Sequence, residues 1–294
     1  MSVTTISQRR RPAVPSFWME AGPVEKTAMI LGVLLLLAAM LASWLTPFEP
    51  NAQSLMSRLR PPLGFERHAP GHLLGTDELG RDVLTRSLHG LRLTLGLALL
   101  GATIGLFIGG STGLIAGMAG GRAEAALMAA VDVQISVPFT LIALLVLAVF
   151  GSSLPVLVFV LGLNGWEQYA RIVRAEVRRL MALPFIEAAR LSGAGPATLA
   201  REHVLPNIVS PIVVQFTLSL SSIILLESTL SFLGLGVQPP TATLGTMVGV
   251  GRNFLQTAPW IVLAPAFFIL AVTFVTQILG DWLRDRTDIR LRGR

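Results

Sequence analysis

Long runs without a charged residue dominate the hydrophobic pattern of this chain. A helix that crosses the hydrocarbon core of a bilayer needs about 20 mainly apolar residues, whereas a transmembrane β-strand alternates over about 10. The runs here are long and do not alternate, so they predict an all-α, polytopic membrane helix bundle with six transmembrane helices. The charge-free runs cover residues 27–48, 93–121, 133–166, 203–226, 228–251 and 253–280.

Turn residues and charges between these runs divide the chain into spans and loops. A long polar loop, residues 47–90, follows the first span, and a second polar segment, residues 171–207, follows the fourth. A polar arm of residues 1–27 precedes the transmembrane domain of residues 28–281, and a basic tail of residues 282–294 follows it. The predicted spans lie at about 28–46, 91–118, 126–150, 154–170, 208–234 and 259–280.

The composition agrees with a membrane protein and orients it. The chain is 52% apolar and 14% charged, whereas soluble domains are about one quarter charged. Sixteen of the 23 arginine and lysine residues lie in the arm, the turn between spans 2 and 3, the segment 171–207 and the tail. Cytoplasmic loops carry the excess of basic residues, so we expect both termini and segment 171–207 in the cytoplasm. The net charge of +6 does not indicate nucleic-acid binding, because the arginines sit in loops.

The segment Glu187–Asn207, called the elbow below, predicts two short helices with a sharp bend. Proline fits the first turn of a helix, where its missing N–H costs nothing, and glycine suits a left-handed helix end. A proline further along stops a helix. We expect the first helix to start at Pro184 and end at Gly193 and Gly195, and the second to run from Pro196 to Pro206.

Glycine recurs at every fourth position through the second predicted span. Residues four apart lie on one face of a helix, and glycine lets another helix backbone approach closely. We therefore expect a helix-packing stripe with a tightly packed neighbour. The stripe consists of Gly101, Gly105, Gly109, Gly113, Gly117 and Gly121.

The sequence lacks the motifs of an ATPase or of another enzyme. A P-loop needs Gly-Lys-Ser/Thr, and Lys26 is the only lysine in the chain. ATP-driven transport would therefore need a second polypeptide. His68 and His72 have the spacing of a helical metal site, but Pro70-Gly71 between them breaks the helix. No cysteine is present, so we expect no disulfide and no thiolate metal site, and the broken helix leads us to expect no metal site at the histidines.

Two acids fall within the predicted spans. Asp132 lies near the start of the third span and Glu227 in the second half of the fifth. Ionisable groups at membrane depth usually face the bundle interior or a wet cavity. Glu227 therefore suits either a substrate path or outer gate, or a buried hydrogen-bond anchor. The anchor is favoured for Asp132. His203, in the elbow, is expected to make a surface or interface contact.

The elbow resembles the loop signature of permease subunits of ATP-binding-cassette importers. It carries Glu187-Ala188-Ala189, then Gly193, then Leu205-Pro206 at the family spacing. The stretch His203–Asn207 is similar to the dipeptide/oligopeptide/nickel branch of that family. Further stretches that resemble this branch are His72–Asp82, Thr46–Asn51, Leu230–Pro240, Pro259-Trp260 and Gly280–Asp285.

This resemblance implies a type I importer permease fold (MetI-like) in a bacterial inner membrane. It implies uptake of short peptides, with nickel or another small solute as the alternative; an ATP-independent carrier is disfavoured. The implied partners are a homologous permease in a heterodimer, two ATPase subunits that bind ATP-Mg, an extracytoplasmic solute-binding protein and the lipid bilayer. This chain itself is expected to bind no cofactor.

The resemblance also assigns roles to residues. At the predicted outer gate the chain has Leu244-Gly245, where the family often has Trp-Gly. The implied ATPase-coupling loop consists of Glu187, Ala188, Ala189, Arg190, Gly193, His203, Leu205 and Pro206.

Overall fold

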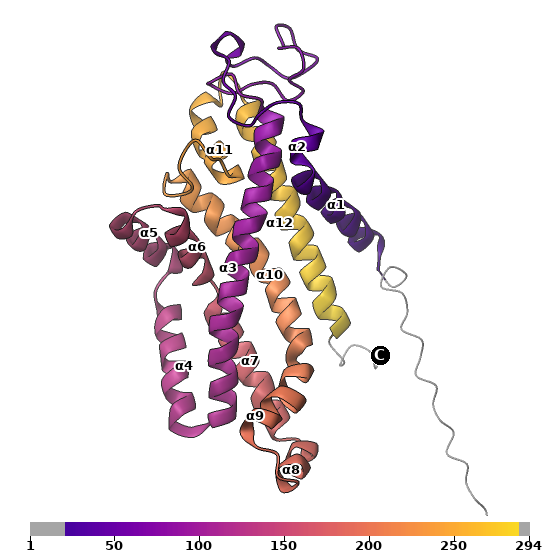
Figure 1. Ribbon diagram of the computed structural model, residues 1–294, viewed down its shortest axis with the longest axis vertical. Coiled ribbons are helices and arrows are strands. Elements are labelled where there is room, and N and C mark those ends of the chain that lie inside the picture. The colour runs from indigo at the N-terminus through magenta and orange to yellow at the C-terminus, as the bar shows by residue number, and fades with distance from the viewer. Residues whose placement is uncertain (1–20, 288–294) are drawn as a thin grey trace, which may run out of the picture.

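The computed structural model describes residues 21–287, and these fold into an elongated bundle of helices (Figure 1). Within these residues the extended pairing is limited to one bridge between Thr76 and Asp82. The helices are α1 (Pro23–Met40), α2 (Ala42–Leu45), η1 (Leu55–Ser57), α3 (Val83–Ala119), α4 (Gly121–Ser136), α5 (Phe139–Phe150), α6 (Leu154–Gly162), α7 (Trp166–Met181), α8 (Pro184–Leu191), α9 (Pro196–Thr198), the π-helical η2 (Leu199–Val204), α10 (Leu205–Phe232), α11 (Leu244–Gly251), η3 (Arg252–Phe254) and α12 (Trp260–Thr287).

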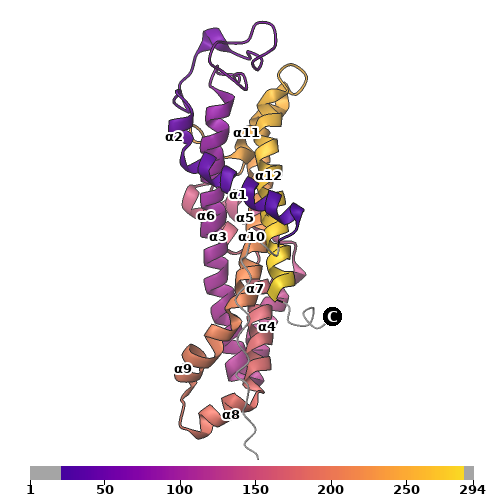
Figure 2. The same cartoon turned by 90° about the vertical axis from the view of Figure 1, so that its right-hand side faces the viewer.

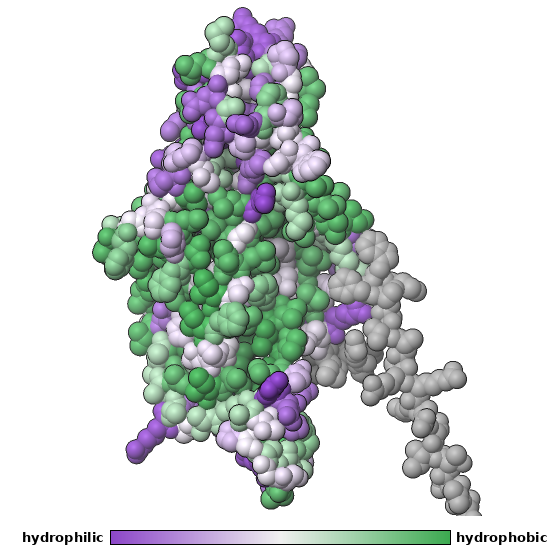
Figure 3. All heavy atoms as spheres, viewed as in Figure 1, coloured by the Kyte–Doolittle hydropathy of each residue, from purple (hydrophilic) through white to green (hydrophobic). Residues whose placement is uncertain are grey.

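Four helices of the described part are long and apolar enough to cross a membrane. They are α1, α3, the continuous helix Pro196–Phe232 and α12, and the bent pair α4–α5 makes a fifth if it counts as one span. A broad apolar belt covers the middle of the bundle, and hydrophilic side chains gather at its two ends (Figure 3). The predicted all-α membrane fold is therefore confirmed, whereas the count of six spans is not. Much of the predicted arm and tail lies outside the described residues.

The third predicted span, 126–150, is wrong as one straight helix. The chain bends by 83° between α4 and α5. The break falls at Val137, which has the extended φ of −113° and ψ of 130°. Proline disfavours helical geometry in the residue before it, so Pro138 explains the break. As a result α5 projects sideways from the bundle (Figure 1).

The fourth predicted span, 154–170, is also interrupted. Helix α6 ends at Gly162, and α7 starts at Trp166 after a turn. Gly165 in this turn has a φ of +84°, a value that glycine adopts without strain. Helix α7 then continues to Met181 as an amphipathic helix, well past the predicted end of the span.

The glycines of α3 lie against α6 and α7. A methyl group added at Gly101 would lie 3.2 Å from the Cβ of Leu161, and one at Gly105 would lie 3.1 Å from the carbonyl oxygen of Gly162. The close contact continues along α3. A methyl group added at Gly109 would lie 2.7 Å from the Cβ of Tyr169, and one added at Gly113 would lie 2.9 Å from the Cβ of Val173. One added at Gly117 would lie 2.7 Å from the Cβ of Val177.

Gly121 does not belong to this stripe, which corrects the sequence prediction. It follows the turn at Gly120 and begins α4, with a φ of +55° and no heavy atom within 4 Å of an added methyl group. Gly121 keeps the four-residue spacing, but α3 ends at Ala119, so Gly121 does not lie on the same helix face as the other glycines.

Residues 46–82, called the cap below, fold over one end of the bundle (Figures 1 and 2). Arg81 holds the cap together through Asp77 at 2.6 Å and Glu78 at 2.7 Å. The indole Nε1 of Trp260, the first residue of α12, donates to the carbonyl oxygen of Thr76 at 3.0 Å. Asp82 caps α3 by accepting a hydrogen bond from the backbone N–H of Thr85. The cap is therefore fixed to two of the long helices.

The two histidines with metal-ligand spacing take separate partners in the cap. The Nδ1 of His72 pairs with Asp82 Oδ2 at 2.8 Å, and its ring stacks on Phe48. His68 Nδ1 lies 3.1 Å from the carbonyl oxygen of Phe65. Both side chains therefore have structural contacts within the cap.

We expect Gly109→Val to destabilise the protein and Gly110→Val to leave it nearly unchanged. Valine has the same helix propensity at both positions, but only Gly109 faces α7; at Gly110 the nearest atom is Leu106 Cδ1 at 3.5 Å. Overpacking costs about 1–3 kcal/mol. Thermal unfolding of the purified variants in detergent measures the difference. Equal melting temperatures would show that the α3–α7 contact is not tight.

Candidate functional site

The elbow protrudes from the end of the bundle opposite the cap (Figures 1 and 2). Helix α8 starts at Pro184, and α9 starts at Pro196, as predicted. Gly193 has the predicted left-handed φ of +90°. Gly195 does not: its φ is −74° with an extended ψ of 168°, and it serves as the N-cap of α9. One left-handed residue is sufficient to make the bend.

Pro206 does not end the second helix of the elbow, which corrects the sequence prediction. It lies in the first turn of α10, and the helix runs unbroken from Pro196 to Phe232. The segment before it is π-helical, with the backbone N–H of Leu205 donating to the carbonyl oxygen of Ala200. Asn207 Nδ2 also donates to the carbonyl oxygen of His203 at 2.6 Å. A proline is tolerated where these bonds replace the regular pattern.

The inner face of the elbow is apolar and fixed to the bundle. Ile186 of α8 is fully buried. Val204 and Ile208 pack in a buried cluster with Val173 and Val177 of α7. The position of the elbow is therefore determined by its packing against α7, so it moves with the lower part of the bundle.

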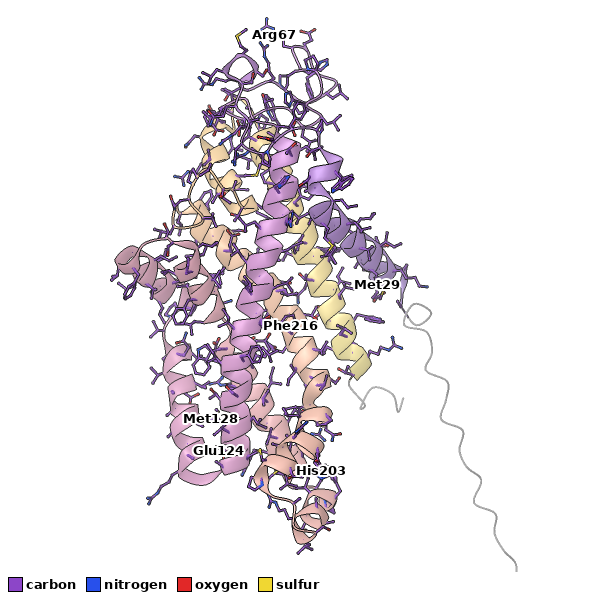
Figure 4. The ribbon with its side chains drawn as sticks, in the orientation of Figure 1. Met29, Arg67, Glu124, Met128, His203 and Phe216 are labelled. Carbon is purple, nitrogen blue, oxygen red and sulfur yellow. The ribbon has the colours of Figure 1, made fainter. Side chains whose placement is uncertain are left out.

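The outer face of the elbow is open to solvent. The residues implied as the coupling loop lie here: Glu187, Ala188, Arg190, Gly193, Leu205 and Pro206 are exposed, and Ala189 and His203 are half-buried. Leu191 between them is 85% exposed. The His203 ring, labelled in Figure 4, lies edge-on to Phe185 at 6.3 Å. The exposed face of the elbow therefore combines both signs of charge with the apolar side chain of Leu191.

Ion pairs that the sequence did not indicate join α4 to α7. Arg174 Nε donates to Glu124 Oε1 at 2.6 Å, and Arg178 Nη1 lies 3.8 Å from the other oxygen of Glu124. Glu124 lies near the foot of α4 (Figure 4). The spacing of the arginines on one helix face was the available signal. The bonds hold α4 against the α7 helix that carries the elbow.

Asp132 is not the buried anchor that the sequence favoured. It lies in the second half of α4, where its carboxylate is 64% exposed and pairs with Arg171 of α7 at 2.7 Å. The partner comes from a segment 39 residues further along the chain. Asp132 therefore forms a second, more exposed ion pair between α4 and α7.

Glu227 is buried where α10 meets α11. It is 1% exposed and accepts hydrogen bonds from Ser231 Oγ at 2.6 Å and Thr243 Oγ1 at 2.7 Å. Thr243 is the N-cap of α11 and forms a capping box with Thr246. Of the two possibilities, the geometry supports the buried hydrogen-bond anchor, because the carboxyl group lies inside the packing.

Leu244, at the predicted outer gate, is fully buried next to Thr243, the residue that bonds Glu227. Its backbone N–H donates to Thr94 Oγ1 of α3 at 3.2 Å. The backbone of Leu244 also approaches Gly90, where an added methyl group would lie 3.2 Å from the Leu244 nitrogen. The first turn of α11 therefore packs directly on α3.

The bundle, the bent α4–α5 pair and the protruding elbow define a class of membrane protein. The fold is similar to that of the MetNI methionine ABC transporter in an inward-facing conformation, with a TM-score of 0.51 and 18% identity over 69% of this chain and 96% of that chain. This is the type I importer permease fold expected from the sequence. Residues 109–289 match the family described as "Binding-protein-dependent transport system inner membrane component". The chain belongs to that family, so it is a multi-pass inner membrane permease component of an ATP-binding-cassette importer.

Curated relatives match over nearly their whole lengths. The chain is 38% identical to the di/tripeptide transport system permease protein DppC of Pseudomonas aeruginosa, over 90% of this chain and 88% of that protein. It is 36% identical to the dipeptide transport system permease protein DppC of Bacillus subtilis, over 93% and 84%. It is 34% identical to the nickel transport system permease protein NikC of Escherichia coli, over 94% and 98%.

We expect Thr243→Val to destabilise the protein more than Thr243→Ser does. Valine has nearly the shape of threonine but leaves the buried carboxyl group of Glu227 without one donor, which costs about 1–3 kcal/mol. Serine keeps the hydroxyl group that bonds Glu227 and caps α11. Thermal unfolding in detergent is the measurement, and equal losses for the two variants would contradict the anchor role of Glu227.

Proposed function

We propose that this chain is a permease subunit for short peptides and that a separate ATPase binds the elbow. Relatives named for di/tripeptide or dipeptide transport match at 38% and 36% identity. The nickel permease is similar over the same length at 34%, so nickel uptake is the second candidate. Solute choice in such systems depends largely on a separate binding protein, and that protein would decide between the two.

The observation that carries the docking proposal is the continuous helix Pro196–Phe232, which begins in the elbow. It has 37 residues, about 55 Å at 1.5 Å per residue. A contact at the exposed elbow would therefore move the helix that reaches the α10–α11 contact at the other end. Packed interfaces change between discrete arrangements rather than deforming smoothly. A movement imposed on the elbow end of this helix would therefore be transmitted to its other end.

The surface chemistry of the elbow supports a protein partner. Glu187 and Arg190 offer opposite charges on the exposed face of α8, and Leu191 adds apolar area. The small side chains Ala188 and Ala189 keep α8 slim, so that it fits a cleft. The sequence has no P-loop lysine of its own, so ATP-Mg would be bound by the partner.

The proposed assembly places the elbow in the cytoplasm. The excess of arginine in the arm, segment 171–207 and the tail supports this orientation, with both termini on the same side. Two ATPase subunits, a homologous permease subunit and an extracytoplasmic solute-binding protein complete the proposed complex. The cap would then face the binding protein.

We expect Glu187→Arg to abolish most ATP-dependent peptide uptake while the protein still reaches the membrane. The substitution reverses one charge in the proposed contact; a loss of about 1.4 kcal/mol lowers affinity tenfold. Uptake by proteoliposomes that contain the complete transporter measures the effect. Copurification of the ATPase with the variant gives a direct second readout.

Gly193→Ser and Gly195→Ser form a matched pair that tests the bend. Both glycines are exposed with no atom within 4 Å of an added methyl group, but only Gly193 has a positive φ. A left-handed conformation costs an ordinary residue about 1–2 kcal/mol, so only Gly193→Ser should lower uptake. Normal uptake with both Glu187→Arg and Gly193→Ser would refute the docking role of the elbow.

A further inference from the structure

One face of α7 differs from the other exposed faces of the bundle. Its exposed residues recur at helical spacing, and they are Gln168, Arg171, Ala175, Arg178 and Arg179. None of these is a large apolar residue. The exposed stripe of α12, by contrast, consists of Leu263, Phe267, Leu270 and Phe274, each 59–68% exposed. The α12 stripe suits lipid, whereas the α7 stripe does not.

The polar face of α7 lies at the depth of the apolar belt. Tyr169 and Val173 contact Gly109 and Gly113 of α3. These glycines stand 6 to 10 residues before the end of α3 at Ala119, or about 9–15 Å along the helix. Residues 93–119 of α3 carry no ionisable side chain. Gln168 and Arg171 therefore lie beside a segment that crosses the bilayer.

The polar face continues onto α10. Asn164, just before α7, donates from Nδ2 to Ser222 Oγ at 3.1 Å, and Gln215 Nε2 donates to Gln168 Oε1 at 2.8 Å. Ser222 and Thr229 are exposed on α10. We call this surface the polar track; its members are Asn164, Gln168, Arg171, Ala175, Ser222 and Thr229.

The Arg171–Asp132 ion pair is the strongest evidence that the polar track faces water. The two side chains are 52% and 64% exposed, although ionisable groups that face hydrocarbon are costly and usually line wet cavities. At the elbow end, the exposed Arg178 continues the same face of α7 toward the surface. The track is thus polar along α7, and on α10 it continues through Ser222 and Thr229, with Leu225, 48% exposed, between them.

We propose that the polar track lines the water-filled path through which the solute passes. Water and the moving solute are then its occupants, rather than lipid or a tightly packed protein surface. Arg171 and Asp132 present both signs of charge to that path, which suits a solute with an ammonium group at one end and a carboxylate at the other. The location of the path stands on the track itself, and only the kind of solute rests on the proposed function.

Labelling of introduced cysteines tests this proposal, because the chain has no cysteine of its own. Ala175→Cys and Ser222→Cys are small changes on the track, with Thr229→Cys as a third. Leu263→Cys and Leu270→Cys on α12 are the matched lipid-facing controls. The variants are assembled with their partner subunits in inside-out membrane vesicles and treated with a negatively charged, membrane-impermeant methanethiosulfonate.

We expect the track cysteines to react at least about tenfold faster than the two controls, since thiolate forms readily in water and not in hydrocarbon. A dipeptide added with ATP should slow the reaction at Ser222→Cys. Labelling after denaturation shows that every variant contains its thiol. Reaction at the control rate would overturn the proposal.

The same vesicles separate this proposal from the proposed function. If the wild-type complex shows no ATP-dependent peptide uptake but the track cysteines react quickly, the peptide function fails and the water-filled path stands. If uptake is normal but the track reacts like the lipid-facing controls, the path runs elsewhere and only the track proposal fails.

Discussion

The close contact between α3 and α7 is the interaction on which the other features of the bundle depend. Gly109, Gly113 and Gly117 let the α7 backbone approach, so that Tyr169 and Val173 are almost completely buried between the helices. In a bilayer, helices associate through such close packing because lipid is as apolar as their side chains. The contact fixes the rotation of α7 about its own axis. Arg171 and Arg174 consequently reach α4 instead of lying between α3 and α7.

That fixed rotation accounts for both ion-pair groups. Arg174 and Arg178 reach Glu124 near the start of α4, and Arg171 reaches Asp132 one to two turns before its end. Exposed pairs contribute little stability, about 0–1 kcal/mol each. Their effect here is directional: they align α4 with α7 after the turn at Gly120. The glycine contact packs α3 against α7, and the ion pairs determine how α4 lies against α7.

The sequence correctly predicted the helix boundaries that are set by the backbone preference of a single proline or glycine. Pro184, Pro196 and Gly193 behave as their chemistry requires. Pro206 did not, because the neighbouring π-helical hydrogen bond from Leu205 to Ala200 has no sequence signature. Hydropathy also missed the bend at Val137 and the turn at Gly165, since it measures apolar content and not direction.

In the candidate site, too, the sequence predicted some features and missed others. The exposed elbow around Glu187 follows from a polar motif between apolar runs, so sequence alone located it. The partners of Asp132 and Glu227 could not be found, because Arg171 and Thr243 lie on other elements and only the fold brings them together. A single sequence gives the residue that needs a partner, but the partner depends on helix packing.

The departures from regular α-helix in the long helix Pro196–Phe232 all lie near the elbow. The π-helical segment ends at Val204, and Pro206 and Pro211 fall within the first two turns of α10. Each proline removes one backbone hydrogen bond donor, and kinks concentrate at such positions. Beyond Pro211 the helix is regular up to Phe232, where Glu227 ties it to α11. The regular part of α10 beyond Pro211 is therefore one rigid piece that ends at the α10–α11 contact, and it continues the helix that begins in the elbow.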